Sequence, residues 1–158
     1  MKVLVFITSF VFFNMFCFSQ SKKEVKAHKI KGSMTTIIEN GKTINEGKTL
    51  FDSKGNEIEK TDYTKEGVLK SIHKIKYNSD GDELEDEQYD SNNKLVEKKY
   101  TKYNLLGEKT EEAFFDGLGK ATKKHTYTYD GKGLKTERKT LDAEGKVISV
   151  KKHVYITK

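Results

Sequence analysis

The sequence predicts an all-β fold, an antiparallel β-meander of repeated hairpins in one twisted sheet that stays open or curls into a half-pipe or barrel. Glycine-type turns recur at alternating gaps of 12 and 14 residues, which defines a 26-residue double-strand repeat. These turns lie at Gly55, Gly67, Gly81, Asn93, Gly107, Gly119, Gly133 and Gly145, and Gly41 extends the series. The segments of 8 to 10 residues between turns have strand length, and the chain contains no proline to interrupt a ladder.

The N-terminus differs from the rest of the chain. Lys2 precedes an almost wholly apolar stretch, and Cys17 and Ser19 place small residues at −3 and −1 of a cleavage site before Gln20. This pattern predicts a signal peptide over residues 1–19 and a secreted, periplasmic or cell-surface protein that does not span the membrane after cleavage. A retained anchor and lipidation of Cys17 are alternatives, although Phe16 is bulky where lipoprotein signals need a small residue.

Residues 20–36 fit the period poorly. We expect them to form an N-terminal segment in which Val25 to Lys31 make a first, lysine-rich edge strand. The repeat domain then covers residues 37–158. The full chain has a net charge of +6, which is too small and too dispersed to indicate binding to nucleic acid.

Each turn follows one template of a large apolar residue, a polar residue, two variable residues and glycine. Phe51 to Gly55 and Tyr77 to Gly81 are examples. Asp or Asn at the second position and a left-handed glycine predict a type I turn closed by a bulge. Asn93 replaces glycine in one copy because asparagine tolerates the same conformation.

A single bulge per hairpin would place every large residue before a turn on one face of the sheet. One row on that face would contain Tyr63, Leu69, Tyr89, Leu95, Phe115, Ala121, Leu141 and Val147. A second row would contain Phe51, Tyr77, Tyr103, Tyr129 and Tyr155, alternating with charged residues. The same register opposes acids to bases along the middle, in the pairs Glu59–His73, Glu85–Lys99, Glu111–His125 and Glu137–Lys151.

The segment Tyr127 to Leu134 resembles the tyrosine–aspartate (YD or RHS) repeat, whose core reads Tyr-x-Tyr-Asp-x-x-Gly-Arg/Asn-Leu. Phe51 to Asn56 and Tyr89 to Leu95 resemble it less closely, and the likeness covers about residues 37–158. The resemblance implies antiparallel sheets in secreted or surface proteins, often shells or carbohydrate-associated modules. This chain is too short to enclose a cargo.

No motif predicts a catalytic, cofactor or metal site. His73 and His125 would lie four strands or about 19 Å apart, too far to share a metal ion. The acidic cluster from Asn78 to Glu87 fails the spacing of an EF-hand loop. Gly117 with Gly119, and Gly131 with Gly133, belong to hairpins rather than to a nucleotide-binding turn.

The sequence therefore predicts a non-enzymatic secreted repeat module that binds a protein or polysaccharide partner at the bacterial cell envelope. An immunity or antitoxin-like protein for a surface toxin is the alternative, and a hydrolase using Glu111 and His125 is a third. The candidate partner-binding residues are the aromatic rows Phe51, Tyr77, Tyr103, Tyr129, Tyr155, Tyr63, Tyr89 and Phe115. The sequence leaves open the ligand, the oligomeric state and barrel closure.

Overall fold

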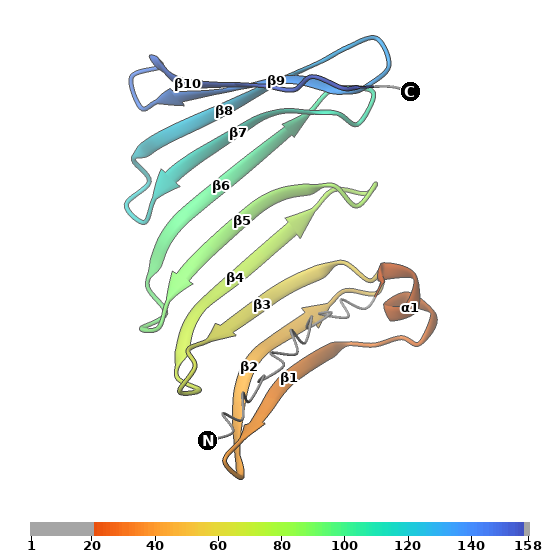
Figure 1. The fold of residues 1–158 in the computed structure, drawn as a ribbon, viewed down its shortest axis with the longest axis vertical. Coiled ribbons are helices and arrows are strands. Elements are labelled where there is room, and N and C mark those ends of the chain that lie inside the picture. Colours follow the sequence, from red (N-terminus) through yellow and green to blue (C-terminus); the bar gives the residue numbers. More distant parts are fainter. Residues whose placement is uncertain (1–20, 157–158) are drawn as a thin grey trace, which may run out of the picture.

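The computed structural model describes residues 21–156, which form one short helix and a single ten-stranded antiparallel sheet (Figure 1). Helix α1 (Lys22–Ala27) precedes β1 (Gly32–Glu39), β2 (Lys42–Phe51), β3 (Glu57–Tyr63), β4 (Leu69–Tyr77), β5 (Glu83–Asp90), β6 (Leu95–Tyr103), β7 (Lys109–Asp116), β8 (Ala121–Tyr129), β9 (Lys135–Asp142) and β10 (Val147–Lys152). The strands pair in sequence order, so the predicted meander is confirmed, as an open sheet. The predicted signal peptide lies outside the described residues.

The predicted turns are confirmed in geometry. The seven turn glycines and Gly41 have φ between 75° and 88°, and Asn93, which replaces glycine in the eighth turn, has a φ of 60°. In the first repeat the Gly55 N–H donates to the carbonyl of Asp52, and the Asp52 carboxylate accepts from the N–H groups of Lys54 and Asn56. The polar residue of the template is therefore required because its side chain satisfies two backbone donors of the turn.

The N-terminal segment differs from the prediction, because Val25 to Lys31 do not form a strand. Ser21 and Glu24 make a reciprocal capping box, which starts α1, and Val25 is the fully buried residue of that helix. The edge strand exists, but it is β1, which begins at Gly32 and crosses the predicted boundary at residue 37. Helix α1 lies against the first turn, where a Cβ on Gly55 would come within 2.7 Å of the Lys22 carbonyl oxygen.

Each hairpin from β2–β3 onward contains a second bulge that the sequence analysis did not predict. The large residue still pairs with the second residue after glycine, as in Tyr63 opposite Leu69. The next pair is Asp62 opposite Ser71, so the third residue after glycine is inserted without a partner. The inserted residues are Ile58, Lys70, Leu84, Val96, Thr110, Thr122, Thr136 and Ile148.

The second bulge corrects the predicted central pairs by one residue. Glu59 faces Lys74 rather than His73, and Glu85 faces Tyr100 rather than Lys99. Glu111 likewise faces Thr126 rather than His125, and Glu137 faces Lys152 rather than Lys151. The predicted register was wrong because it allowed only one extra residue per hairpin.

The prediction that all large residues share one face was also wrong. Tyr89 pairs with Ile72, and Tyr77 lies five residues farther along the same strand, so Tyr77 and Tyr89 point to opposite faces. We call the side with Tyr63, Tyr89, Tyr100, Phe115 and Leu141 the groove face. The opposite face carries Phe51, Tyr77, Tyr103, Phe114 and Tyr129. The two predicted aromatic rows lie on different faces because each inserted residue shifts the inward–outward alternation of side chains by one residue.

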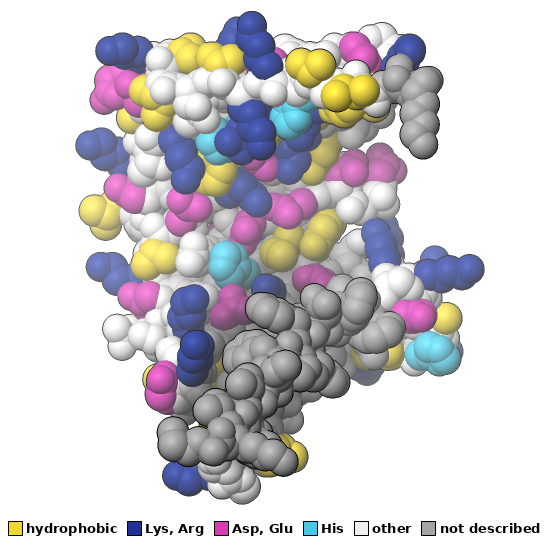
Figure 2. Space-filling view, viewed as in Figure 1, with side chains coloured by type: hydrophobic (Ala, Val, Ile, Leu, Met, Phe, Trp, Pro, Cys, Tyr) yellow, Lys and Arg dark blue, Asp and Glu magenta, His cyan; other side chains and the backbone are white. Residues whose placement is uncertain are grey.

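The sheet has little apolar core. Val25 and Phe114 are the buried hydrophobic residues of the described chain. Four of the buried side chains in the strands, Ser71, Thr101, Glu112 and Phe114, lie on the opposite face. On the face seen in Figure 2, acidic, basic and histidine side chains are interspersed with scattered apolar ones. Within residues 21–156 the short helix α1 is the only element besides the sheet, so no second layer of strands or helices covers the sheet in this part of the chain.

Candidate binding groove

A groove of about 750 Å³ crosses the groove face over β5 to β9. Its floor is apolar and comes from four successive strands: Tyr100 on β6, Ala113 and Phe115 on β7, Ala121 on β8 and Leu141 on β9. The turn between β9 and β10, at Ala143, Glu144 and Gly145, closes one end. The small side chains of Ala113 and Ala121 leave the space that the larger residues border.

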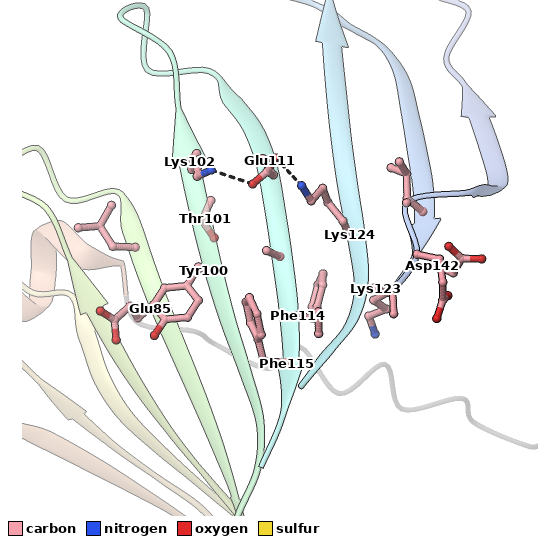
Figure 3. A pocket seen from close by; sticks show the side chains of 17 residues that line it. Glu85, Tyr100, Thr101, Lys102, Glu111, Phe114, Phe115, Lys123, Lys124 and Asp142 are labelled. Atoms are coloured by element: carbon pink, nitrogen blue, oxygen red, sulfur yellow. Dashed lines mark ion pairs between the residues drawn. The ribbon is translucent and has the colours of Figure 1, made fainter. Parts of the chain in front are cut away.

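Charged side chains form one side of the groove. Glu111 accepts from Lys102 at 3.0 Å and from Lys124 at 3.2 Å, so one carboxylate joins three neighbouring strands. Figure 3 shows both lysines reaching Glu111 from the flanking strands, with Tyr100 and Phe115 farther along the groove. The hydrogen bond from Lys102, and that from Lys124, hold the pKa of Glu111 below its usual value despite partial burial. An ionised, doubly paired carboxylate is a poor general base.

The aromatic rings of the floor have a fixed arrangement. Tyr100 and Phe115 meet edge to face, with ring centroids 5.7 Å apart and planes at 82°. The ammonium group of Lys98 lies 4.8 Å from the Tyr100 centroid and pairs with Glu87 at 2.9 Å and Glu85 at 3.2 Å. These contacts, first with Tyr100 and then with Glu87, raise the pKa of Lys98. The groove thus combines an apolar floor with charged groups at its border.

The opposite face carries a paired polar network around Glu112. Glu112 is 11% exposed, accepts from Lys109 at 2.6 Å and from the Tyr127 hydroxyl, and lies beside the buried ring of Phe114. Burial raises the pKa of Glu112, but the hydrogen bonds from Lys109 and Tyr127 outweigh it and lower the pKa overall. Burial and the same carboxylate raise the pKa of Tyr127. Removing one partner of this network would leave a buried charge unpaired, which is strongly destabilising.

The eight predicted aromatic residues are divided between the two faces, and Phe115 lines the groove. Four of the others form a periodic structural series on the opposite face. The hydroxyls of Tyr77, Tyr103, Tyr129 and Tyr155 each donate to a backbone carbonyl 20 residues earlier, those of Glu57, Glu83, Lys109 and Lys135. The distances are 2.8, 3.0, 2.9 and 2.8 Å. Phe51 occupies the same template position without a hydroxyl.

The histidines have other partners than predicted. His73 Nδ1 lies 3.0 Å from Asp86, and His125 Nδ1 lies 3.1 Å from the Thr140 hydroxyl. Burial and the nearby charge of Arg138 lower the pKa of His125. Among residues 21–156, no group of three or more histidine, cysteine or acidic side chains is placed to hold a metal ion. In the same part of the chain, no helix has the length and apolar character needed to cross a membrane.

The sequence analysis missed Tyr100, Ala113, Lys102 and Lys124 as groove residues. They lie within strands, where the template gives no signal. Ala113 shares a face with Phe115 by simple alternation on β7, whereas Tyr100, Lys102 and Lys124 do so because of the second bulge. The inserted residue is a threonine in three hairpins, and the Thr110 and Thr122 hydroxyls donate to carbonyls of the preceding strand. This recurrence is a weak signal, since threonine is common in all strands.

Comparisons with known proteins do not show a family for the chain. No protein-family model and no curated protein matches the sequence. A solved protein of unknown function from Bacteroides fragilis is 14% identical, with 80% of this chain and 96% of that one aligned at a TM-score of 0.44. A porin-like protein from Bacteroides uniformis is 15% identical over 75% of this chain and 48% of its own, at 0.40. TarM is 20% identical, with 80% of this chain and 22% of TarM aligned at a TM-score of 0.30.

Proposed function

We propose that the protein is a non-enzymatic module that binds a protein or polysaccharide partner at the bacterial cell envelope through the groove over β5 to β9. The observation that carries this proposal is the apolar floor of Tyr100, Ala113 and Phe115 beside the ionised row of Lys102, Glu111 and Lys124. A planar apolar surface packs against a sugar ring or an apolar side chain, and the charged row supplies hydrogen bonds at its border.

The uncovered sheet supports the same proposal. Domains usually bury a sheet face against a second layer, whereas the groove face here has no such layer within residues 21–156. The residues of the groove come from five strands, so their positions are fixed by the hydrogen-bonded ladder before a partner arrives. A preformed site loses less conformational entropy on binding than a mobile one.

The test uses the purified protein on a glycan array and in affinity capture from an envelope extract. We expect Ala113→Arg, which fills the floor, to abolish binding of whatever ligand the unmodified protein selects. Leu106→Arg is the matched control, because Leu106 is a turn residue that is 82% exposed and lies outside the groove. Unchanged binding by Ala113→Arg would exclude the groove as the site. A protein that selects neither a glycan nor an envelope component would contradict the proposed function.

A further inference from the structure

The outer edge of β10, the last strand of the sheet, is a second candidate binding surface, separate from the groove. One side of β10 pairs with β9, and the other side has no neighbouring strand among residues 21–156. All six residues of β10 are exposed, including Val147, Ile148 and Val150 at 45%, 60% and 47%. The unpaired N–H and C=O groups of such an edge accept an additional strand.

The charges of the strands follow an alternating order from β3 to β8. Strands β3, β5 and β7 are mainly acidic, and β5 carries five acidic residues and no basic one. Strands β4, β6 and β8 are mainly basic, and β4 and β8 contain lysines but no acidic residue. Every basic strand in this series therefore lies next to an acidic strand, which favours pairing across the sheet.

This order breaks at the C-terminal end of the sheet. Strand β9 has three basic and two acidic residues, and β10 has two lysines and no acidic residue. Within residues 21–156, Lys151 and Lys152 form no ion pair, whereas Lys98 on the interior strand β6 pairs with both Glu85 and Glu87. The earlier basic strands β4, β6 and β8 each have at least one mainly acidic neighbour, whereas β10 has none among residues 21–156.

We propose that the outer edge of β10 binds an extended, acid-rich segment of a partner protein, which adds an eleventh antiparallel strand to the sheet. Lys151 and Lys152 point to opposite faces, so a segment with acids at consecutive positions matches both. A second copy of this chain fits less well, because a second β10 is equally basic and β1 contains a single acidic residue. Lysines on an edge deter pairing between like strands but attract an acidic one.

The experiment uses the purified full chain and a fluorescent peptide with the sequence of Glu83–Asp90, the strand that pairs with basic β4 and β6 within the sheet. We expect saturable binding by fluorescence anisotropy, weakened by added salt, with amide NMR shift changes concentrated in Val147–Lys152. The double variant Lys151→Glu and Lys152→Glu should bind at least tenfold more weakly. A peptide of equal length with lysine in place of each acidic residue should not bind.

Two controls separate this edge from general charge and from the groove. The double variant Lys65→Glu and Lys132→Glu makes the same change in net charge at exposed turn residues and should keep full binding. The groove variant Ala113→Arg should also bind the peptide normally. Equal loss in both double variants, shift changes on other strands, or self-association of the protein through β10 would overturn the proposal.

Discussion

Successive turns lie at opposite ends of the strands, and the two sets of turns use the same sequence template for different purposes. At the turns of Gly81, Gly107 and Gly133, the preceding tyrosine lies on the opposite face and its hydroxyl binds a backbone carbonyl of the strand before it. At the turns of Gly67, Asn93 and Gly119, the equivalent Tyr63, Tyr89 and Phe115 lie on the groove face. The Tyr89 hydroxyl donates to a side chain, that of Glu87, at 2.7 Å.

The backbone explains the first of these roles. The ladder between β3 and β4 begins at Glu59 opposite Lys74, so Glu57 and the inserted Ile58 have no partner on β4. The Tyr77 hydroxyl supplies the missing donor to the Glu57 carbonyl, and burial with the charge of Glu83 raises its pKa to about 12. The same position of the template therefore has different roles in successive turns. The extra residue in each hairpin places successive pre-turn residues on alternate faces of the sheet, and the face determines what each side chain contacts.

The largest expected difference between the two faces lies in the adjacent residues Phe114 and Phe115. Phe114→Ala should lower the free energy of unfolding by about 3 kcal/mol, because it removes a buried ring. The centroid of that ring lies 5.1 Å from the centroid of the His125 ring and 4.3 Å from the Nζ atom of Lys123. Phe115→Ala should cost less stability but abolish ligand binding in the groove. Urea unfolding and the binding assay measure the two effects. Equal destabilisation by both variants would mean that the faces do not differ as described.

The next effect concerns the carboxylates of Glu112 and Glu111, again on opposite faces. The pKa of each is lowered from its usual value of 4.5, so the stabilisation is complete above that pH and is lost as the pH falls through the folded-state pKa. Glu112→Gln should cost about 1–3 kcal/mol at pH 7 because it breaks charged hydrogen bonds to Lys109 and Tyr127.

The neighbouring and more exposed carboxylate of Glu111 provides the control for this prediction. Glu111→Gln should cost less than about 1 kcal/mol, as expected for partly exposed ion pairs. Urea unfolding at pH 7 and at pH 3 gives the pH dependence. Glu112→Gln should flatten it more than Glu111→Gln, and the reverse order would show that the network on the opposite face is not the stronger one.

The smallest expected effect tests the periodic hydroxyls. Tyr103→Phe should cost about 1 kcal/mol, because the Glu83 carbonyl loses its donor at 3.0 Å. The matched change Tyr63→Phe lies before the Gly67 turn, at the opposite end of the strands. It should leave the free energy of unfolding unchanged within a few tenths of a kcal/mol. Thermal unfolding of both variants is sufficient. A neutral Tyr103→Phe would contradict the structural role of the series.

The central charge pairs show how far sequence reasoning reaches. The predicted pair Glu85–Lys99 and the observed neighbours Asp86 and Lys99, or Glu87 and Lys98, all oppose an acid to a base. Whole strands are acidic or basic, so a shift of one residue preserves charge complementarity. The acid–base pairs that supported the predicted register are therefore equally compatible with the observed one, so complementary charges carried no information on the register.

The sequence by itself determined the strands, their order and the left-handed turns, because glycine or asparagine at a fixed spacing is a local requirement of the backbone. Only the tertiary structure decided which side chains share a face, since the second bulge appears in the pairing of the strands and is occupied by residues as different as Lys70, Leu84 and Thr110. The helix α1, the tyrosine-to-carbonyl series and the groove on Tyr100 and Phe115 follow from contacts between segments, which a periodic pattern does not specify.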